Sequence, residues 1–135
     1  MSKQQTYSNV IYFHDTDQAS VVHHANYLNY MEEGRIEFLN TLGCPYHDLQ
    51  KEHIGLAPIE VNIRYLSPLR LGDTFTVKTT LTTLKKASLV FEQDIYCQET
   101  LCTTATVKLA CLNEAHYKVI PMPKKLYTLL SGTIA

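Results

Sequence analysis

The stretch ANYLNYMEEGRIEFLNTL, residues 25–42, predicts the long helix of the chain and, through it, the fold class. Its apolar side chains recur at the spacing of a helix face: Leu28, Met31, Phe38, Leu39 and Leu42. Gly43 and Pro45 follow the stretch, as is typical of a helix end. Inside the helix, Gly34 costs up to about 1 kcal/mol relative to alanine. We expect this cost to be tolerated because the helix packs closely against a sheet at that point.

Strands are predicted on both sides of this helix. Residues 7–13 are aromatic and β-branched, which predicts a first strand, and the polar residues 14–20 predict a loop. Four longer strands are predicted after the helix, at residues 55–66, 74–84, 88–98 and 101–112. Short polar breaks separate these strands, as in an antiparallel meander. A last short helix is predicted for residues 123–130.

This order of elements predicts an α+β fold in which one helix covers one face of a sheet. In the strand 55–66, Val61, Ile63 and Tyr65 alternate with polar residues and are expected on one face. Strands at the edges of a sheet leave unpaired backbone groups. Pairing of two edges into a dimer is a natural way to satisfy them. Glu32 and Arg35 lie three residues apart and are expected to pair on the exposed side of the helix.

Composition places the chain among ordinary globular proteins. Its 135 residues are 45% hydrophobic and 19% charged, which fits one domain over residues 1–135. The net charge of −1 gives no broad electrostatic reason to bind nucleic acid or an anionic membrane. The sequence contains no run of about 18 apolar residues, so no transmembrane helix is predicted. The polar residues 1–6 lack the apolar core of a signal peptide, so a cytoplasmic location is expected.

Cysteine and histidine spacing does not predict a metal site. The four cysteines, Cys44, Cys97, Cys102 and Cys111, form no Cys-x-x-Cys pair and are expected to be buried as small hydrophobic residues. His23 and His24 are adjacent, whereas histidines that bind one metal from a helix usually lie four residues apart. Neither a metal nor another cofactor is therefore expected.

Titratable side chains gather just before the helix. Asp15, Asp17, His23, His24 and Asn26 lie in a loop that runs into its first turn. Unpaired backbone N–H groups at a helix start can polarise a carbonyl and hold a developing oxyanion. A carboxylate ahead of them can attack that carbonyl or activate water. Taken alone the pattern is weak, because aspartate in a loop often only forms a turn.

The same residues match a known family. Asp15-Thr16-Asp17, the run from Val21 to Leu28, and then Glu32 and Arg35 resemble the 4-hydroxybenzoyl-CoA thioesterase family. The pattern is most similar to the acyl-CoA thioesterases encoded beside the bacterial Tol-Pal system. The resemblance extends to Tyr65, Pro68 and the turn Arg70-Leu71-Gly72-Asp73, and so covers nearly the whole chain in the right order.

This resemblance implies a hotdog fold, with one long helix wrapped by a five-stranded antiparallel sheet, in homodimers or homotetramers. It implies that Asp17 is the catalytic carboxylate and that His24 acts beside it. The backbone from about His24 would polarise the thioester carbonyl. Lys85 and Lys86 would lie against the CoA phosphates, although paired lysines are also common in a solvated turn. Asn26 would cap the helix or contact substrate, and Tyr27 would line the acyl pocket or belong to the core.

Two positions depart from the family pattern. Ser20 replaces the usual glycine, and glycine adopts backbone conformations that strain serine. His23 stands where an aromatic residue, commonly tyrosine, precedes the histidine. We expect Ser20 to alter the path of the loop or to contact the ligand, and His23 to alter the acyl pocket more than the role of Asp17.

Three functions remain open on this basis. The first is hydrolysis of short-chain or aromatic acyl-CoA thioesters, with Asp17 as nucleophile or general base. The second is action on thioesters of acyl carrier protein, or binding of acyl groups without turnover. Acyl carrier protein is acidic, so Lys78, Lys85 and Lys86 would suit it as well as CoA. The third is a structural or interaction module, since a fold alone does not decide function.

Overall fold

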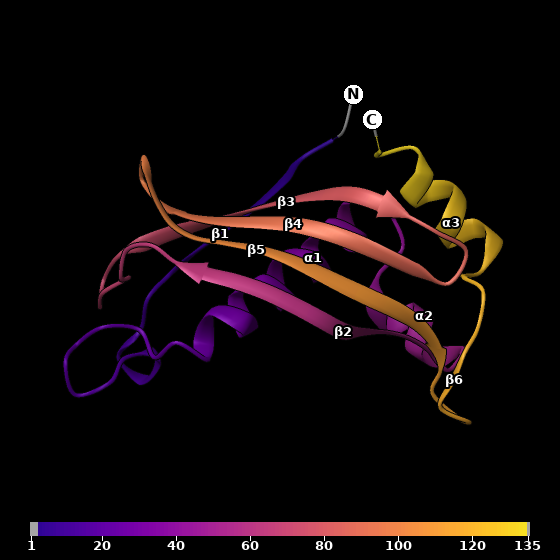
Figure 1. Ribbon diagram of the computed structural model, residues 1–135, viewed down its shortest axis with the longest axis horizontal. Coiled ribbons are helices and arrows are strands. Elements are labelled where there is room, and N and C mark those ends of the chain that lie inside the picture. The colour runs from indigo at the N-terminus through magenta and orange to yellow at the C-terminus, as the bar shows by residue number, and fades with distance from the viewer. Residues whose placement is uncertain (1–2, 135) are drawn as a thin grey trace.

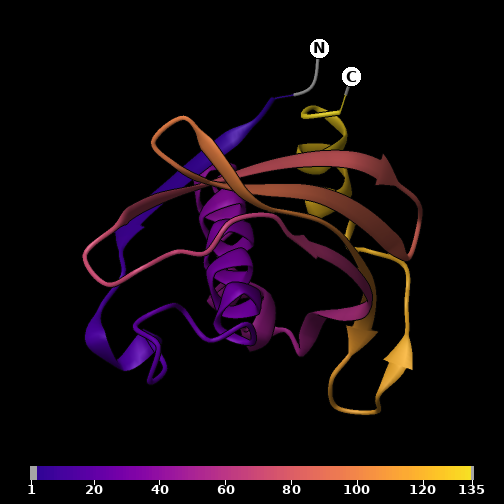
Figure 2. The same ribbon diagram turned by 60° about the vertical axis from the view of Figure 1, so that its left-hand side comes forward.

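A long helix, α1 (Asn26–Thr41), lies within a curled antiparallel sheet (Figures 1 and 2). The computed structural model describes residues 3–134. Two shorter helices, α2 (Tyr46–Lys51) and α3 (Lys124–Ser131), lie toward one end of the sheet, and a single 3-10 turn, η1 (Phe13–Asp15), precedes α1. No helix within residues 3–134 has the length and apolar character needed to cross a bilayer.

Five long strands make the sheet, and a two-residue strand extends it. Their bounds are β1 (Gln5–Val10), β2 (Ile54–Tyr65), β3 (Thr74–Leu84), β4 (Ser88–Cys97), β5 (Thr100–Asn113) and β6 (Lys118–Val119). The spatial order is β1-β3-β4-β5-β2, and β6 pairs with the end of β5. Every pairing is antiparallel. This arrangement confirms the α+β hotdog fold that the sequence predicted.

The boundaries differ from the prediction mainly at the first strand. β1 ends at Val10, opposite Thr74, because β3 begins there and offers no partner beyond it. The chain then turns through η1, where an extension of the strand to Phe13 was predicted. Helix α2 was not predicted at all: the proline that signals the end of α1, Pro45, is also the residue that precedes α2. The short strand β6 was missed as well.

Helix α1 lies against β1 and β3 and turns its apolar face toward the sheet. The buried residues of this face are Tyr27, Tyr30, Met31, Gly34, Phe38 and Leu39. Phe38 meets Phe91 of β4 edge-to-face, with ring centroids 5.1 Å apart. A Cβ atom on Gly34 would lie 2.8 Å from Val77 Cγ1, so the expected close approach of helix and sheet is confirmed.

Strand β2 forms an edge of the sheet and is covered poorly. It pairs with β5 on one side only, and a bulge interrupts the register between Pro58 and Glu60. Of the three apolar residues expected on one face of this strand, Ile63 packs against the core, whereas Val61 and Tyr65 are 38% and 47% exposed. The main contacts of β2 are with β5 and α2 rather than α1. One side of the sheet therefore offers apolar surface that this chain alone does not cover.

Candidate active site

A tight loop holds Asp17 in front of helix α1. Its ends are joined by an antiparallel bridge between Thr16 and Val22, and the Asp17 N–H donates to the Val21 carbonyl at 2.9 Å. Inside the loop, the Ala19 N–H donates to Asp17 Oδ1 at 2.8 Å. Asp17 therefore forms a turn, as loop aspartates commonly do. The side chain nevertheless stays exposed at the tip of the loop.

Ser20 closes this loop in a left-handed conformation. Its φ of 63° lies in the region that glycine adopts freely and other residues adopt with strain. Ser20 thus adopts a backbone conformation that favours glycine, and its expected effect on the loop path or on the ligand stays a prediction. The neighbouring Val22 N–H donates to the Leu69 carbonyl at 2.8 Å, which ties the loop to the segment before β3.

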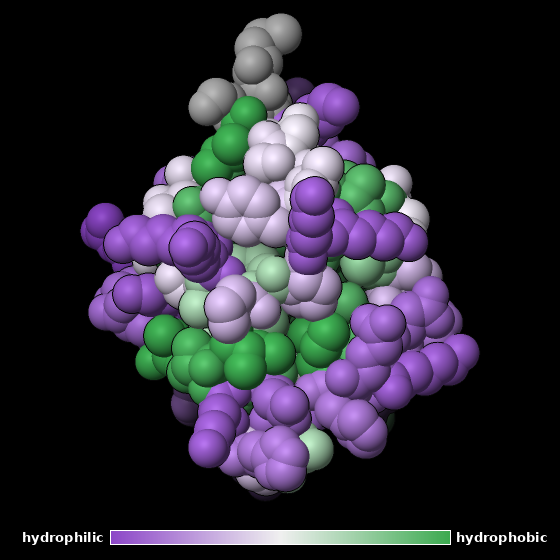
Figure 3. Space-filling model, turned by 90° about the vertical axis from the view of Figure 1, so that its right-hand side faces the viewer, coloured by the Kyte–Doolittle hydropathy of each residue, from purple (hydrophilic) through white to green (hydrophobic). Residues whose placement is uncertain are grey.

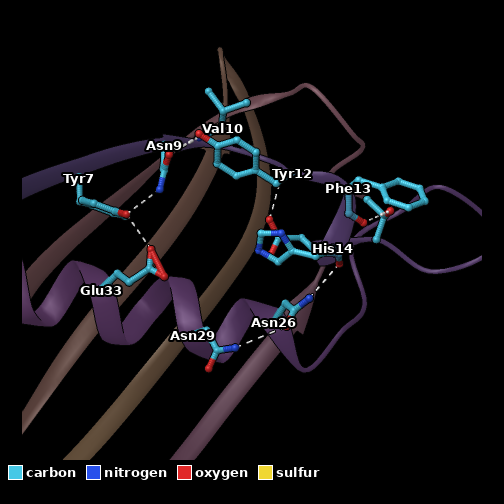
Figure 4. A network of polar contacts seen from close by, with 11 residues as sticks. Tyr7, Asn9, Val10, Tyr12, Phe13, His14, Asn26, Asn29 and Glu33 are labelled. Atoms are coloured by element: carbon cyan, nitrogen blue, oxygen red, sulfur yellow. Dashed lines mark hydrogen bonds and ion pairs between the residues drawn. The ribbon is translucent and has the colours of Figure 1, made fainter.

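A network of hydrogen bonds fixes η1 against the start of α1 (Figure 4). Asp15 Oδ2 accepts from the Tyr12 N–H at 3.0 Å, so Asp15 has the turn-forming role expected of it. Asn26 Nδ2 donates to the Asp15 carbonyl at 2.8 Å. Farther along, the Tyr7 hydroxyl of β1 donates to Glu33 Oε1 of α1 at 2.6 Å. Asn26 thus anchors the loop to the helix and does not cap the helix with its side chain.

The two residues just before α1, His24 and Ala25, present free backbone donors within the described part of the chain. The N-cap residue is Ala25, which has no side chain able to cap. The N–H groups of Asn26, Tyr27 and Leu28 donate three residues back, to His23, His24 and Ala25. Within residues 3–134, the N–H groups of His24 and Ala25 have no hydrogen-bond acceptor. Free N–H groups at the positive end of a helix dipole are suited to hold a carbonyl oxygen as it gains negative charge.

His24 projects from this turn beside Tyr65 of β2. The Tyr65 hydroxyl donates to the His24 carbonyl at 3.1 Å, and the two rings meet edge-on at 6.4 Å. The His23 ring lies 4.4 Å from that of His24. A hollow of about 290 Å³ adjoins His24, with walls from Tyr27, Tyr65 and Leu66 among others. Tyr65 was not predicted as a site residue, although its place on one face of the predicted strand with Val61 and Ile63 was an available signal.

Tyr27 forms the inner wall of that hollow rather than projecting into it. It is 3% exposed, and its hydroxyl accepts a hydrogen bond from the Leu69 N–H at 3.1 Å. Burial raises the pKa of the Tyr27 hydroxyl, and the bond from Leu69 acts in the opposite direction. Tyr27 is therefore a core residue that also borders the candidate site.

Asp17 and His24 lie seven residues apart in the sequence, on the loop and at the helix start that follows it. Within the described part of the chain, no hydrogen bond or ion pair joins them, and Asp17 does not line the hollow beside His24. No group of three His, Cys, Asp or Glu side chains in residues 3–134 is arranged to hold a metal ion. In a single chain, the candidate site thus lies open at the corner of the fold where the Asp17 loop meets the start of α1. It presents a carboxylate, an imidazole and free N–H groups there.

Lys85 and Lys86 lie far from this corner. The Asp17 loop pairs with Arg70, shortly before β3 begins. Lys85 and Lys86 follow directly after the last residue of β3. The 11 residues of β3 separate the two places by about 33 Å. We call the end of the sheet that carries Lys85 and Lys86 the lysine end. Figure 3 shows hydrophilic side chains around a hydrophobic band on this end. The structure of one chain therefore does not bring Lys85 and Lys86 together with Asp17.

The pair expected between Glu32 and Arg35 is not formed. The Arg35 guanidinium instead donates to Gln93 Oε1 of β4 at 3.0 Å, and no ion pair joins Arg35 to a carboxylate within residues 3–134. A buried amide acceptor on the sheet competes successfully with an exposed carboxylate, whose pairing on a helix surface is worth little.

Comparison with known proteins agrees with this fold. The family model of the thioesterase-like superfamily matches residues 11–130. The acyl-CoA thioesterase YbgC of Haemophilus influenzae is 32% identical over 117 residues, which cover 86% of each chain.

Two solved structures are similar over most of their length. A probable thioesterase from Bartonella henselae is 30% identical, with a TM-score of 0.86 over 90% of this chain and 100% of that one. A gentisyl-coenzyme A thioesterase is 28% identical, with the same TM-score over 90% of this chain and 98% of its own. The similarity to YbgC fits the branch that the sequence pattern predicted. By the match over residues 11–130, this chain belongs to the thioesterase-like superfamily.

Proposed function

We propose that this protein hydrolyses acyl-CoA thioesters to the free acid and CoA, with Asp17 as the reacting carboxylate. One observation carries the proposal: an exposed carboxylate is held in a fixed loop ahead of a helix start whose His24 and Ala25 N–H groups have no acceptor among residues 3–134. Membership of the thioesterase-like superfamily supports the same chemistry. The YbgC relative is named as an acyl-CoA thioesterase.

Two routes fit the geometry. In the first, Asp17 attacks the carbonyl carbon, the C–S bond breaks, and the thiolate leaves as a proton reaches it. Water then cleaves the mixed anhydride and restores the carboxylate. In the second, Asp17 takes a proton from water, which attacks the carbonyl directly. In both routes the free N–H groups would stabilise the oxyanion, and His24 would orient water or protonate the leaving thiolate.

The acyl group is proposed to be short or aromatic. The hollow beside His24 has aromatic walls, and its volume of about 290 Å³ is close to the lower end of small-molecule sites. A gentisyl-coenzyme A thioesterase is among the structural relatives.

We propose that two copies of the chain complete the site through β2. The free edge of β2 and its exposed residues Val61 and Tyr65 need a cover. Antiparallel pairing of two β2 edges would set the Tyr65 end of one strand beside the Ile54 end of the other. The Ile54 end lies level with the β3–β4 turn, because Leu56 pairs with Cys111, whose N–H donates to Ala87. The partner's lysines would thus approach the helix start. Whether two such dimers form a tetramer stays open.

The lysine end carries more lysines than the two that the sequence predicted there. Its exposed lysines are Lys85, Lys86, Lys118, Lys124 and Lys125. The Met122 N–H donates to the Lys86 carbonyl at 2.8 Å, which joins the segment before α3 to the β3–β4 turn. This cluster would bind the phosphates of CoA as point charges. The same cluster favours a second candidate substrate, a thioester on acidic acyl carrier protein. The proposed setting for either substrate is the cytoplasm.

Thiol release from a panel of short-chain and aromatic acyl-CoA thioesters tests the proposal. We expect Asp17→Asn to lower kcat by several hundred-fold or more, because asparagine keeps the shape but cannot attack or accept a proton. Asp48→Asn, an exposed aspartate on α2, is the matched control and should retain full activity. A folded Asp17→Asn protein with wild-type rates would refute the role of Asp17.

The same panel of thioesters distinguishes this function from the other candidate functions. Turnover of carrier-protein thioesters alone, with a strong decrease as salt is added, would favour the second candidate. Binding of acyl-CoA without thiol release would favour a non-catalytic acyl-binding protein.

A further inference from the structure

Arg35 of α1 is a half-buried cation that forms no ion pair with a carboxylate within residues 3–134. Among the same residues its guanidinium donates one hydrogen bond, to Gln93 Oε1 at 3.0 Å, and Glu32, one turn earlier on the helix, is exposed. Burial lowers the pKa of Arg35, and the charge of Glu32 opposes this shift. An arginine has five N–H donors, so a single bond leaves most of them unused. A buried charge without a counter-charge is costly unless a ligand supplies one.

Gln93 holds the guanidinium in place. This glutamine is fully buried, and its Nε2 donates to the Met31 carbonyl at 2.8 Å and to Thr79 Oγ1 at 3.0 Å. Its amide oxygen is thereby oriented toward Arg35. Because helix and sheet both fix Gln93, the position of Arg35 is set before any ligand arrives.

Arg35 borders a second hollow, whose walls are mainly apolar. The cavity has a volume of about 270 Å³, and its apolar lining comes from Ile36, Leu39, Leu56, Pro58, Phe91 and Leu109. An apolar cavity of about 150 Å³ is enough to hold benzene, so this one admits a substituted ring or a medium chain. An apolar cavity with one cationic group matches a ligand that is apolar along its length and anionic at one end.

The cavity lies on the same side of α1 as the candidate active site. His24, Leu28 and Arg35 follow one another at helical spacing, and Leu28 between them is 44% exposed. On the facing strand, Val61 lies between Pro58, which borders the Arg35 cavity, and Tyr65, which borders the His24 hollow. The backbones of His24 and Arg35 are about 16 Å apart along the helix. The Arg35 side chain points back toward the helix start, which shortens the span left for an acyl group.

We propose that Arg35 selects acyl groups that carry a carboxylate at the end distant from the thioester. The inference rests on the proposed thioesterase function and names its substrate class. The planar guanidinium would bind that carboxylate through its unused donors, while the apolar walls cover the chain or ring between the two ends. Glu32 at the border of the same cavity would repel the carboxylate weakly, because it is exposed to solvent.

Matched substrates test this selectivity. Each CoA thioester of a dicarboxylic acid, from four to ten carbons, is compared with the thioester of the monoacid of equal length. The 4-carboxybenzoyl thioester is compared in the same way with 4-methylbenzoyl. We expect wild type to prefer the carboxylated member by about 10- to 100-fold in kcat/KM at the best length, as a charge-assisted hydrogen bond allows. Arg35→Met should remove this preference while keeping turnover of the uncharged member.

Two further variants keep the test decisive. Arg35→Lys retains the charge but not the planar fork, and should retain part of the preference. Glu32→Gln should raise turnover of carboxylated substrates slightly, because it removes the repelling charge at the border of the cavity. Glu37→Gln, which replaces an exposed glutamate of the same helix outside this cavity, is the matched control and should leave turnover of both members unchanged. Wild type without a preference, or a preference that survives in folded Arg35→Met, would overturn the proposal.

Binding of the free dicarboxylic acids, measured by calorimetry, gives a readout independent of turnover. Tighter binding to wild type than to Arg35→Met supports the role of Arg35 even if no thioester is hydrolysed, which would refute only the proposed function. Equal binding to both proteins would overturn the role of Arg35 even if the monoacid thioesters are hydrolysed.

Discussion

Replacing Gly34 with alanine tests how closely α1 approaches the sheet. The added Cβ would lie 2.8 Å from Val77 Cγ1 and 3.1 Å from both Gln93 Nε2 and Thr79 Oγ1. In a free helix, alanine would be better by about 1 kcal/mol. Overpacking of a core costs about 1–3 kcal/mol. Displacing Gln93 would also weaken two hydrogen bonds, worth about 0.5–1.5 kcal/mol each. We therefore expect a net loss of about 2 kcal/mol, or roughly 6–10 °C in the melting temperature.

Urea unfolding at a fixed protein concentration measures this loss, since assembly of the chain would make its stability depend on concentration. The double variant Gly34→Ala, Val77→Ala makes room for the new methyl group. We expect the two substitutions together to destabilise the protein less than the sum of their separate effects, by at least about 0.5 kcal/mol. Stabilisation by Gly34→Ala alone, or strict additivity in the double variant, would refute the close approach.

Two further predictions follow from the backbone and the cysteines. Ser20→Gly should raise the free energy of unfolding by up to about 1 kcal/mol, because relief of the left-handed strain exceeds the entropy that glycine adds to the unfolded chain; a lower melting temperature would contradict the strain at this position. Burial raises the pKa of all four cysteine thiols, so less reactive thiolate is present at neutral pH. A thiol reagent should label the half-buried Cys97 first and Cys111 only after unfolding, whereas rapid labelling of Cys111 in the native protein would show that it is accessible.

Elements with a long hydrophobic repeat were predictable to within one or two residues. The stretch 25–42 became α1 at Asn26–Thr41, and the predicted strand 74–84 is β3 without change. Both elements bury one face along most of their length, and this produces a regular hydrophobic pattern in the sequence. Helix α2 has six residues, of which one, Leu49, is buried. Its position depends instead on a long-range bond, from the Leu56 N–H to the Tyr46 hydroxyl, that no local pattern reveals.

The candidate site likewise has parts that were predictable from the sequence and parts that were not. Asp17, His24 and the helix start could be placed together because all lie within one loop and the turn that follows. The link between Arg35 and Gln93 joins residues 58 positions apart in the chain. Helical spacing favoured Glu32 as the partner of Arg35, and only the packing of α1 on β4 shows that an amide takes this place. The separation of Lys85 and Lys86 from Asp17 likewise follows from the length of β3, not from any motif.

Reaction and selectivity are therefore expected to respond to different parts of the fold. The groups at the helix start are held by bonds within residues 12–28, by the segment before β3 and by the Tyr65 hydroxyl of β2, so substitutions elsewhere in the sheet should leave them in place. Arg35 is held through Gln93, which helix and sheet fix together. A change that shifts α1 against the sheet, such as Gly34→Ala, should thus disturb recognition of the distal end of the acyl group before it disturbs hydrolysis. Equal losses on carboxylated and uncharged thioesters in that variant would mean that the two ends of α1 do not act independently.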